Sequence, residues 1–85
     1  MRVRWLENPL VSVPKEARRE AERALAKVDL SGLGDYERGG SFAPLYMGEG
    51  LLLKLAKVEG KLLVLASVWE CGSLVEEHVV GEVEG

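Results

Sequence analysis

Residues 50–72 read GLLLKLAKVEGKLLVLASVWECG, and this stretch restricts the possible folds more than any other part of the chain. It contains two apolar runs of strand length, separated by Glu59 and Gly60. Glycine readily adopts the positive φ that a tight turn requires. The pattern therefore predicts a β-hairpin with strands at 51–58 and 61–70.

The same stretch does not fit a membrane span. Four charged side chains interrupt it, namely Lys54, Lys57, Glu59 and Lys61. Each charge near a bilayer centre costs about 2.5–3.5 kcal/mol on the scale derived from insertion experiments. A single continuous helix is also disfavoured, because Gly60 would lie in its middle and almost every side would be apolar. We therefore expect no membrane association.

Pairing Val58 with Lys61 sorts the hairpin side chains onto two faces, because successive residues of a strand point to opposite sides. Both faces are largely apolar, so the hairpin needs cover on two sides. One face carries Leu51, Leu53, Leu55, Leu62, Val64, Ala66 and Val68, with Lys57 beside the turn; the other carries Leu52, Ala56, Val58, Leu63, Leu65 and Trp69, interrupted by Lys54, Lys61 and Ser67.

One long helix is predicted over 14–28, where Ala17, Ala21 and Leu25 recur at helical spacing. Pro14 suits its first position. The alanine-rich face allows a close approach to a sheet, yet it covers only one side of that sheet.

Further strands are predicted on both sides of this helix. Residues 1–7, MRVRWLE, alternate as a strand that joins the sheet. Residues 41–47 are predicted to form a short strand, and Pro44 makes it an edge strand or a bulged one.

The C-terminal segment 73–81 carries two conflicting signals. Ser73 and Glu76 have the spacing of a capping box, and Gly81 suits a helix end. The alternation of its valines and glutamates instead favours an edge strand. We expect a short helix over 74–80 and a frayed GEVEG terminus. The fold class is then α+β, an antiparallel sheet of an N-terminal strand and a C-terminal meander packed on the long helix.

Length and composition limit the domain organisation and the cellular location that we expect for the protein. A chain of 85 residues is predicted to form a single domain over 1–85, near the size at which one core is barely sufficient. Cys71 is the only cysteine, so no intrachain disulfide forms. No signal peptide is evident, and we expect a cytoplasmic protein. The absence of Ile, Thr and Gln beside many charges resembles thermophile composition, which codon bias also produces.

Charge and motifs point away from several functions. Residues 1–27 hold seven basic and four acidic side chains, whereas 28–85 hold four and ten, and the pI is about 5.2. This balance lacks the basic excess of a nucleic-acid binder. Cys71 and His78 offer a thiolate–imidazole pair in principle, but their isolation makes them structural residues in our interpretation. We expect no catalytic residue, metal or cofactor.

The order of elements resembles the small toxins of the RelE/ParE superfamily. The resemblance is carried by VPKEARREAERAL before a strand meander that includes GLLLKLAKVEGKLLVLAS. It implies an antitoxin-like protein partner and an action on mRNA, the ribosome or gyrase, or an inactive member of that family. The residues placed to contact nucleic acid would be Arg18, Arg19, Arg23, Lys54, Lys57 and Lys61.

The leading prediction is a protein–protein interaction module that is not an enzyme. It self-associates, as a homodimer or another homo-oligomer, through the sheet face that its helix cannot cover. The interface residues expected on that face are Leu52, Leu63, Leu65 and Trp69. The RelE/ParE-like toxin is the alternative.

Overall fold

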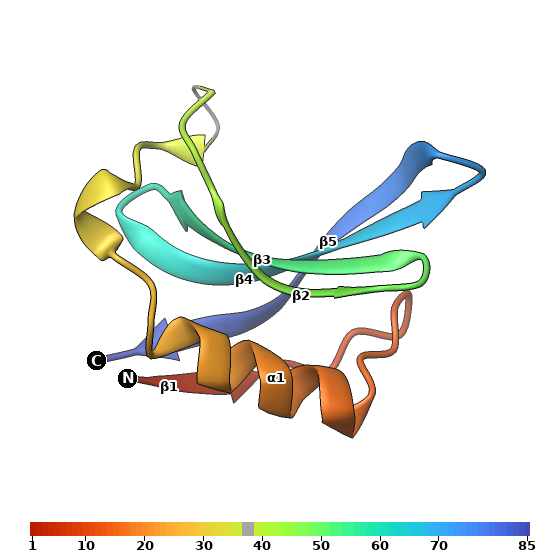
Figure 1. The fold of residues 1–85 in the computed structure, drawn as a ribbon, viewed down its shortest axis with the longest axis horizontal. Helices are drawn as coiled ribbons and strands as arrows, with labels where there is room; N and C mark the ends of the chain where they lie inside the picture. The colour runs from red at the N-terminus through yellow and green to blue at the C-terminus, as the bar shows by residue number, and fades with distance from the viewer. Residues whose placement is uncertain (37–38) are drawn as a thin grey trace.

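The computed structural model describes residues 1–36 and 39–85, and it has the α+β architecture predicted from the sequence (Figure 1). One helix lies against one face of a curled five-stranded sheet. In chain order the elements are β1 (Arg2–Trp5), α1 (Lys15–Leu25), the short 3-10 helix η1 (Leu30–Gly32), β2 (Ala43–Gly48), β3 (Leu51–Val58), β4 (Lys61–Glu70) and β5 (Ser73–Glu84).

The sheet has the strand order β1-β5-β4-β3-β2, and all neighbouring strands are antiparallel. Strands β2 to β5 form a meander, and β1 adds to it beside the last strand. Arg2 pairs with Glu84 and Trp5 with Gly81, which places the two ends of the chain side by side (Figure 1).

The predicted hairpin is confirmed in both its bounds and its register. Val58 pairs with Lys61, and the turn residues Glu59 and Gly60 have φ angles of 51° and 79°. Two consecutive positive φ values match the twist of antiparallel strands. The β4–β5 turn repeats this geometry at Cys71 and Gly72, with φ angles of 50° and 79°.

The short strand around Pro44 is also confirmed, since β2 lies at the sheet edge and carries an irregularity. The register with β3 shifts between Pro44 and Tyr46. The extra residue, Leu45, is buried. The edge position fits proline, which has no N–H to donate to a second neighbour.

The prediction of a short C-terminal helix over 74–80 was wrong, because this segment belongs to β5. The strand pairs with β4 over most of its length and with β1 at its end, up to Glu84, so the terminus is not frayed either. Gly81 packs beneath β1 and does not end a helix: a Cβ atom there would lie 2.9 Å from Val3 Cγ1. The pairing of β5 with β4 and β1 stabilises the extended conformation more than the capping residues stabilise a helix.

Helix α1 is shorter than the predicted 14–28, with Pro14 as the extended N-cap residue and Leu25 as the last helical residue. Its predicted apolar face is confirmed, because Ala17, Ala21 and Leu25 are buried. A tighter turn follows, in which Lys27 N donates to Ala24 O. The small alanine side chains bring the helix close to the sheet.

The core lies between α1 and the sheet face that carries Leu53, Leu55 and Val64, which we call the core face. These three side chains are fully buried. Ala66 and Val80 complete this layer.

Leu53→Ala should lower the free energy of unfolding by about 2–5 kcal/mol, because the site is tightly enclosed and a cavity remains. Urea denaturation followed by circular dichroism measures the change. The matched control is Met47→Ala on the neighbouring strand, where the side chain is 78% exposed and the change should stay within about 0.5 kcal/mol. Equal effects at both positions would contradict this assignment of the core.

Candidate interaction surface

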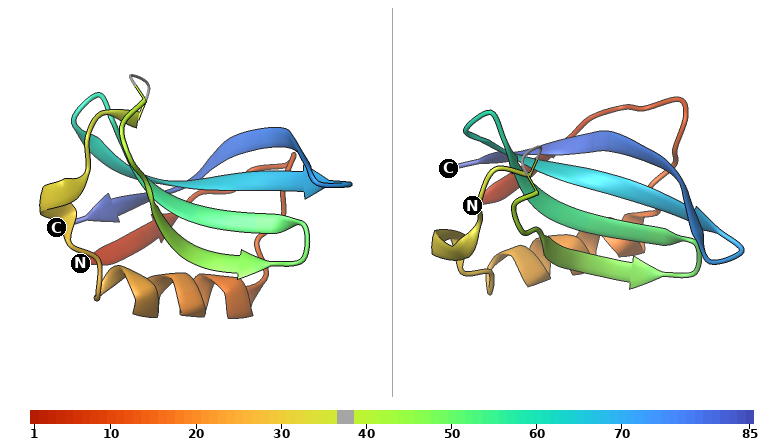
Figure 2. Two further views of the ribbon diagram at one scale, coloured as in Figure 1. Left: turned by 45° about the horizontal axis from the view of Figure 1, so that its top comes forward. Right: turned by 90° about the horizontal axis from the view of Figure 1, so that it is seen from above.

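The opposite side of the sheet, which we call the outer face, carries no helix from the described part of the chain. Strand alternation places Leu52, Lys54, Leu63, Leu65, Ser67 and Trp69 on this face. The question raised by the sequence is what covers these side chains. Of the residues between η1 and β2, those described, 33–36 and 39–42, lie at the end of the sheet near the β3–β4 turn (Figure 2). Among them, Asp35 forms a parallel bridge with Lys57 of β3.

A polar cluster lies in the middle of the outer face and is centred on Lys54, which is only 5% exposed. Its ammonium nitrogen lies 2.7 Å from Glu77 Oε2 and donates to Tyr36 Oη at 2.6 Å. Ser67 Oγ donates to the same carboxylate oxygen at 3.0 Å, and Tyr36 Oη lies 3.2 Å from it. Lys54, Tyr36, Ser67 and Glu77 are called the polar cluster below.

Two aromatic rings enclose the buried ammonium. Lys54 Nζ lies 4.9 Å from the ring centre of Tyr36 and 4.7 Å from that of Phe42. The two rings meet edge to face at 6.2 Å. A cation over aromatic faces is attracted by their negative π clouds, most strongly when water is excluded. The contacts hold residues 33–36 and 39–42 on the sheet.

Hydrogen bonding decides the charge state of the cluster. Burial disfavours the charged form of Lys54, but the hydrogen bonds to Glu77 and Tyr36 outweigh it, so the pKa of Lys54 is raised. Burial also disfavours the charged form of Glu77. Hydrogen bonds from Lys54 and Ser67 outweigh that effect and lower the pKa of the Glu77 carboxyl. At neutral pH the pair is therefore ionised.

Apolar side chains remain accessible on either side of the polar cluster. Near the β3–β4 turn, Val58, Leu63 and Val79 line a shallow hollow of about 230 Å³ with Tyr36. At the opposite end, Trp69 pairs across the strands with Leu74. Their exposed fractions are 41% and 49%. The side chains of Tyr36 and Phe42 thus cover Lys54 at the centre of the outer face, and apolar side chains on both sides of it stay accessible.

The second open end belongs to a projecting hairpin, residues 69–77, which we call the arm. Trp69 N still donates to Gly50 O at 2.9 Å, but beyond this point the arm extends past the β2–β3 turn (Figures 1 and 2). Every residue of the arm is exposed. A two-stranded hairpin exposed on both faces has little stability of its own.

The four predicted interface residues share the outer face, but they differ in accessibility. Trp69 is exposed, Leu52 and Leu63 are half-buried, and Leu65 is only 5% exposed. Leu65 therefore offers little surface to a partner. The interface itself stays a prediction.

The six basic residues predicted for nucleic acid do not gather on one surface. Arg18, Arg19 and Arg23 lie on α1, below the core face, whereas Lys54 lies on the outer face within the polar cluster. The remaining two, Lys57 and Lys61, are exposed beside the β3–β4 turn. The resemblance to RelE/ParE toxins stays a prediction.

Cys71 and His78 lie apart, Cys71 in the turn of the arm and His78 beyond its base in β5. His78 pairs with Ala66, four β4 residues before the strand end. That separation is roughly 13 Å along the strand, too far for a thiolate–imidazole contact. His78 Nε2 instead lies 3.0 Å from Glu76 Oε2. Within residues 1–36 and 39–85, no group of three His, Cys, Asp or Glu is arranged to hold a metal.

Sequence reasoning missed the partners of Lys54. A lysine between leucines on a predicted strand face is a signal that a counter-ion exists, since a buried charge is costly unless it is paired. The sequence did not identify that counter-ion, because Glu77 lies 23 positions away in a segment predicted to be helical.

No protein-family description, curated protein or solved structure matches this chain. Among the described residues, no helix is long and apolar enough to cross a membrane.

Lys54→Met should lower the free energy of unfolding by about 1–3 kcal/mol, because it leaves the partly buried Glu77 carboxylate without its cation. Thermal and urea denaturation at pH 7 measure the loss. Lys57→Met on the same strand is the matched control, since Lys57 is exposed and its removal should change stability by less than about 0.5 kcal/mol. A Lys54→Met protein as stable as the control would show that the Lys54–Glu77 pair contributes nothing to the free energy of unfolding.

The ion pair also predicts a pH dependence with a definite sign. Because the pKa of Glu77 is lowered in the folded state, its stabilisation is complete above the ordinary value of 4.5 and is lost as the pH falls through the folded-state pKa. Glu77→Gln should therefore flatten the fall in stability between pH 5 and pH 3, relative to the unsubstituted protein. Urea denaturation at a series of pH values measures the free energy of unfolding of both proteins. Equal losses of this free energy between pH 5 and pH 3 in the two proteins would contradict the prediction.

Proposed function

We propose that this protein is a protein–protein interaction module that self-associates through its arm and the adjoining outer face. The observation that carries the proposal is the exposure of the arm. Trp69, Leu74 and Val75 are 41%, 49% and 50% exposed on a hairpin that projects from the sheet. Exposed apolar side chains that gather on one projecting element are typical of interaction sites.

The free edge of β5 supports the same conclusion. Strand β1 pairs with β5 only from Gly81 to Glu84, and Leu6 N donates to Val80 O. Between Ser73 and His78, no described segment other than β4 bonds to the β5 backbone. An unpaired strand edge accepts a further strand through its main-chain groups.

The occupant that fits this edge is a second copy of the chain. Antiparallel pairing of two identical edges follows from a two-fold axis, the commonest symmetry of protein dimers. An axis near Val75 places this valine opposite its own counterpart and Leu74 opposite Glu76. It avoids direct alignment of Glu76 with itself.

The charges of the arm permit this pairing. Residues 69–77 contain no Lys, Arg or Pro, the residues that often protect a strand edge. One of the three arm glutamates has a cationic partner within the chain, because Glu77 pairs with Lys54, and the carboxylate of Glu76 contacts the imidazole of His78. Repulsion between two arms is correspondingly reduced.

The unsubstituted protein should be a dimer at micromolar concentration in sedimentation equilibrium. Val75→Lys should weaken dimerisation at least a hundredfold, since it places two ammonium groups together near the axis. The fold should persist, because Val75 is the bulged residue without a partner in β4. Leu10→Lys is the control: Leu10 is 70% exposed outside the arm, and its replacement should leave the dimer intact.

Two outcomes would overturn self-association. One is an unsubstituted protein that sediments as a monomer up to 100 μM, a generous limit for a specific interface of roughly 800 Å² per chain. The other is a Val75→Lys protein that dimerises as strongly as the Leu10→Lys control. Leu63→Lys extends the test, because it reports whether the contact reaches the far end of the outer face.

A further inference from the structure

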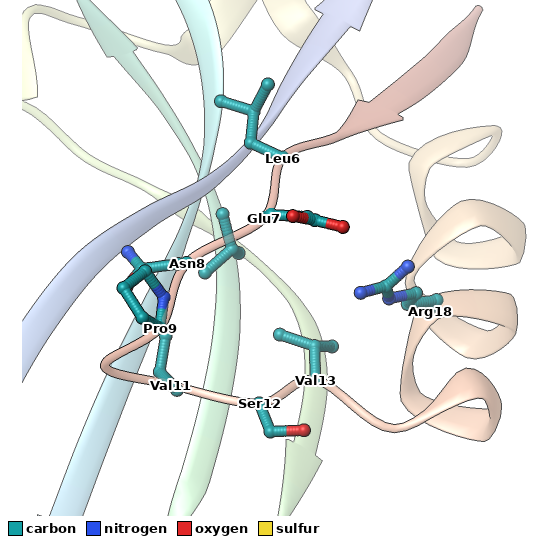
Figure 3. A pocket seen from close by; sticks show the side chains of 9 residues that line it. Leu6, Glu7, Asn8, Pro9, Val11, Ser12, Val13 and Arg18 are labelled. Atoms are coloured by element: carbon teal, nitrogen blue, oxygen red, sulfur yellow. The ribbon is translucent and has the colours of Figure 1, made fainter.

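A hollow of about 520 Å³ lies between the β1–α1 loop, α1 and Val80 of β5. The loop between β1 and α1 curves around it, and α1 closes the other side (Figure 3). Its lining combines apolar residues, among them Leu6, Val11, Val13 and Val80, with the polar residues Glu7, Asn8 and Ser12. Volumes of this size are typical of sites for small ligands.

Arg18 brings a positive charge into this hollow, beside its apolar side chains. Its guanidinium reaches inward from α1, as Figure 3 shows. Its central carbon lies 5.3 Å from the ring centre of Trp5. The indole is itself held in place, because Trp5 Nε1 donates to Glu22 Oε1 at 2.8 Å. The guanidinium is therefore positioned before any ligand binds.

The hydrogen-bonding capacity of Arg18 is unused within the described part of the chain. Its Nε atom is buried and has no hydrogen-bond partner there. The ion pairs among those residues involve Arg4, Lys54 and His78, and none includes Arg18. A guanidinium beside apolar walls gains most from a carboxylate, which accepts two parallel N–H bonds.

We propose that this hollow binds an aliphatic carboxylate. The carboxylate accepts hydrogen bonds from the terminal nitrogens of Arg18, and the hydrocarbon part lies against Leu6, Val11, Val13 and Val80. The single cation and the nearby Glu7 carboxylate, which points toward Arg18 in Figure 3, disfavour a dianion such as phosphate. The carboxylate belongs to a free small acid or to the C-terminus of a peptide.

The test is a titration with 4-methylpentanoate, followed by the backbone amide and Trp5 indole resonances in ¹H–¹⁵N NMR spectra. Saturable shifts confined to residues 6–13, Trp5 and Arg18 are expected at millimolar concentration. The uncharged 4-methylpentanamide should cause no saturable shift. Binding of the amide as strong as that of the acid would overturn the proposal, and so would the absence of saturable binding by any acid.

Variants of α1 separate the role of Arg18 from general effects of charge. Arg18→Met keeps an unbranched side chain against Trp5 and should weaken acid binding at least tenfold. Arg19→Met, one position along the same helix and exposed, should bind as the unsubstituted protein does. Arg18→Lys keeps the charge without the planar fork and should retain intermediate affinity. Glu7→Gln should bind equally or more tightly, because it removes a competing carboxylate.

The source of the carboxylate is decided by a second ligand. Acetyl-Ala-Leu with a free C-terminus and its C-terminal amide are titrated beside 4-methylpentanoate. Tighter binding of the peptide acid than of the free acid supports a C-terminal tail as the ligand, and the reverse order supports a small acid. Unchanged binding in Arg18→Met protein with an intact spectrum would overturn both. None of these outcomes depends on the arm, so failure here leaves the proposed dimer standing.

Discussion

The ion pair between Lys54 and Glu77 connects more of this structure than any other single interaction. Lys54 belongs to a central strand and Glu77 to the base of the arm, and Tyr36 joins them from the segment between η1 and β2. Three parts of the chain that are distant in sequence therefore meet at one buried charge. A lysine in an apolar sheet face is tolerable only with such partners. The partners in turn determine where the covering segment lies.

The hairpin was predictable because its signals are local. The alternation of residues 51–70 and the turn at Gly60 lie within one continuous stretch, and the observed pairing of Val58 with Lys61 follows from them. The alanine face of α1 was predictable for the same reason, since helical periodicity needs no knowledge of distant segments. Only the ends of that helix differed.

The C-terminal strand and the polar cluster could not be predicted from local sequence signals. Ser73, Glu76 and Gly81 form a credible helix signal when considered alone, but the segment gains two strand neighbours that the local pattern does not reveal. Gly81 shows the reason most clearly, because its lack of a side chain accommodates Val3 on β1, 78 positions earlier in the sequence. Glu77 was not recognised as the counter-ion of Lys54, because it belongs to the same segment, which was predicted to be helical. The wrong prediction for β5 therefore also prevented prediction of the polar cluster, which contains Glu77 of that strand.

The two surfaces described here differ in how firmly the fold supports them. The hollow beside Arg18 is lined by the loop between β1 and α1, by Arg18 of α1 and by Val80 of β5, and the fold supports it because Val13 and Val80 are buried in the core. The arm is formed by β4 and β5, and Glu77 at its base makes the ion pair with Lys54 at the sheet centre. Movement of β5 at that residue alters the contacts with Lys54, Tyr36 and Ser67 together. In the proposed dimer, contact with the arm would therefore also act on the residues that cover the outer face.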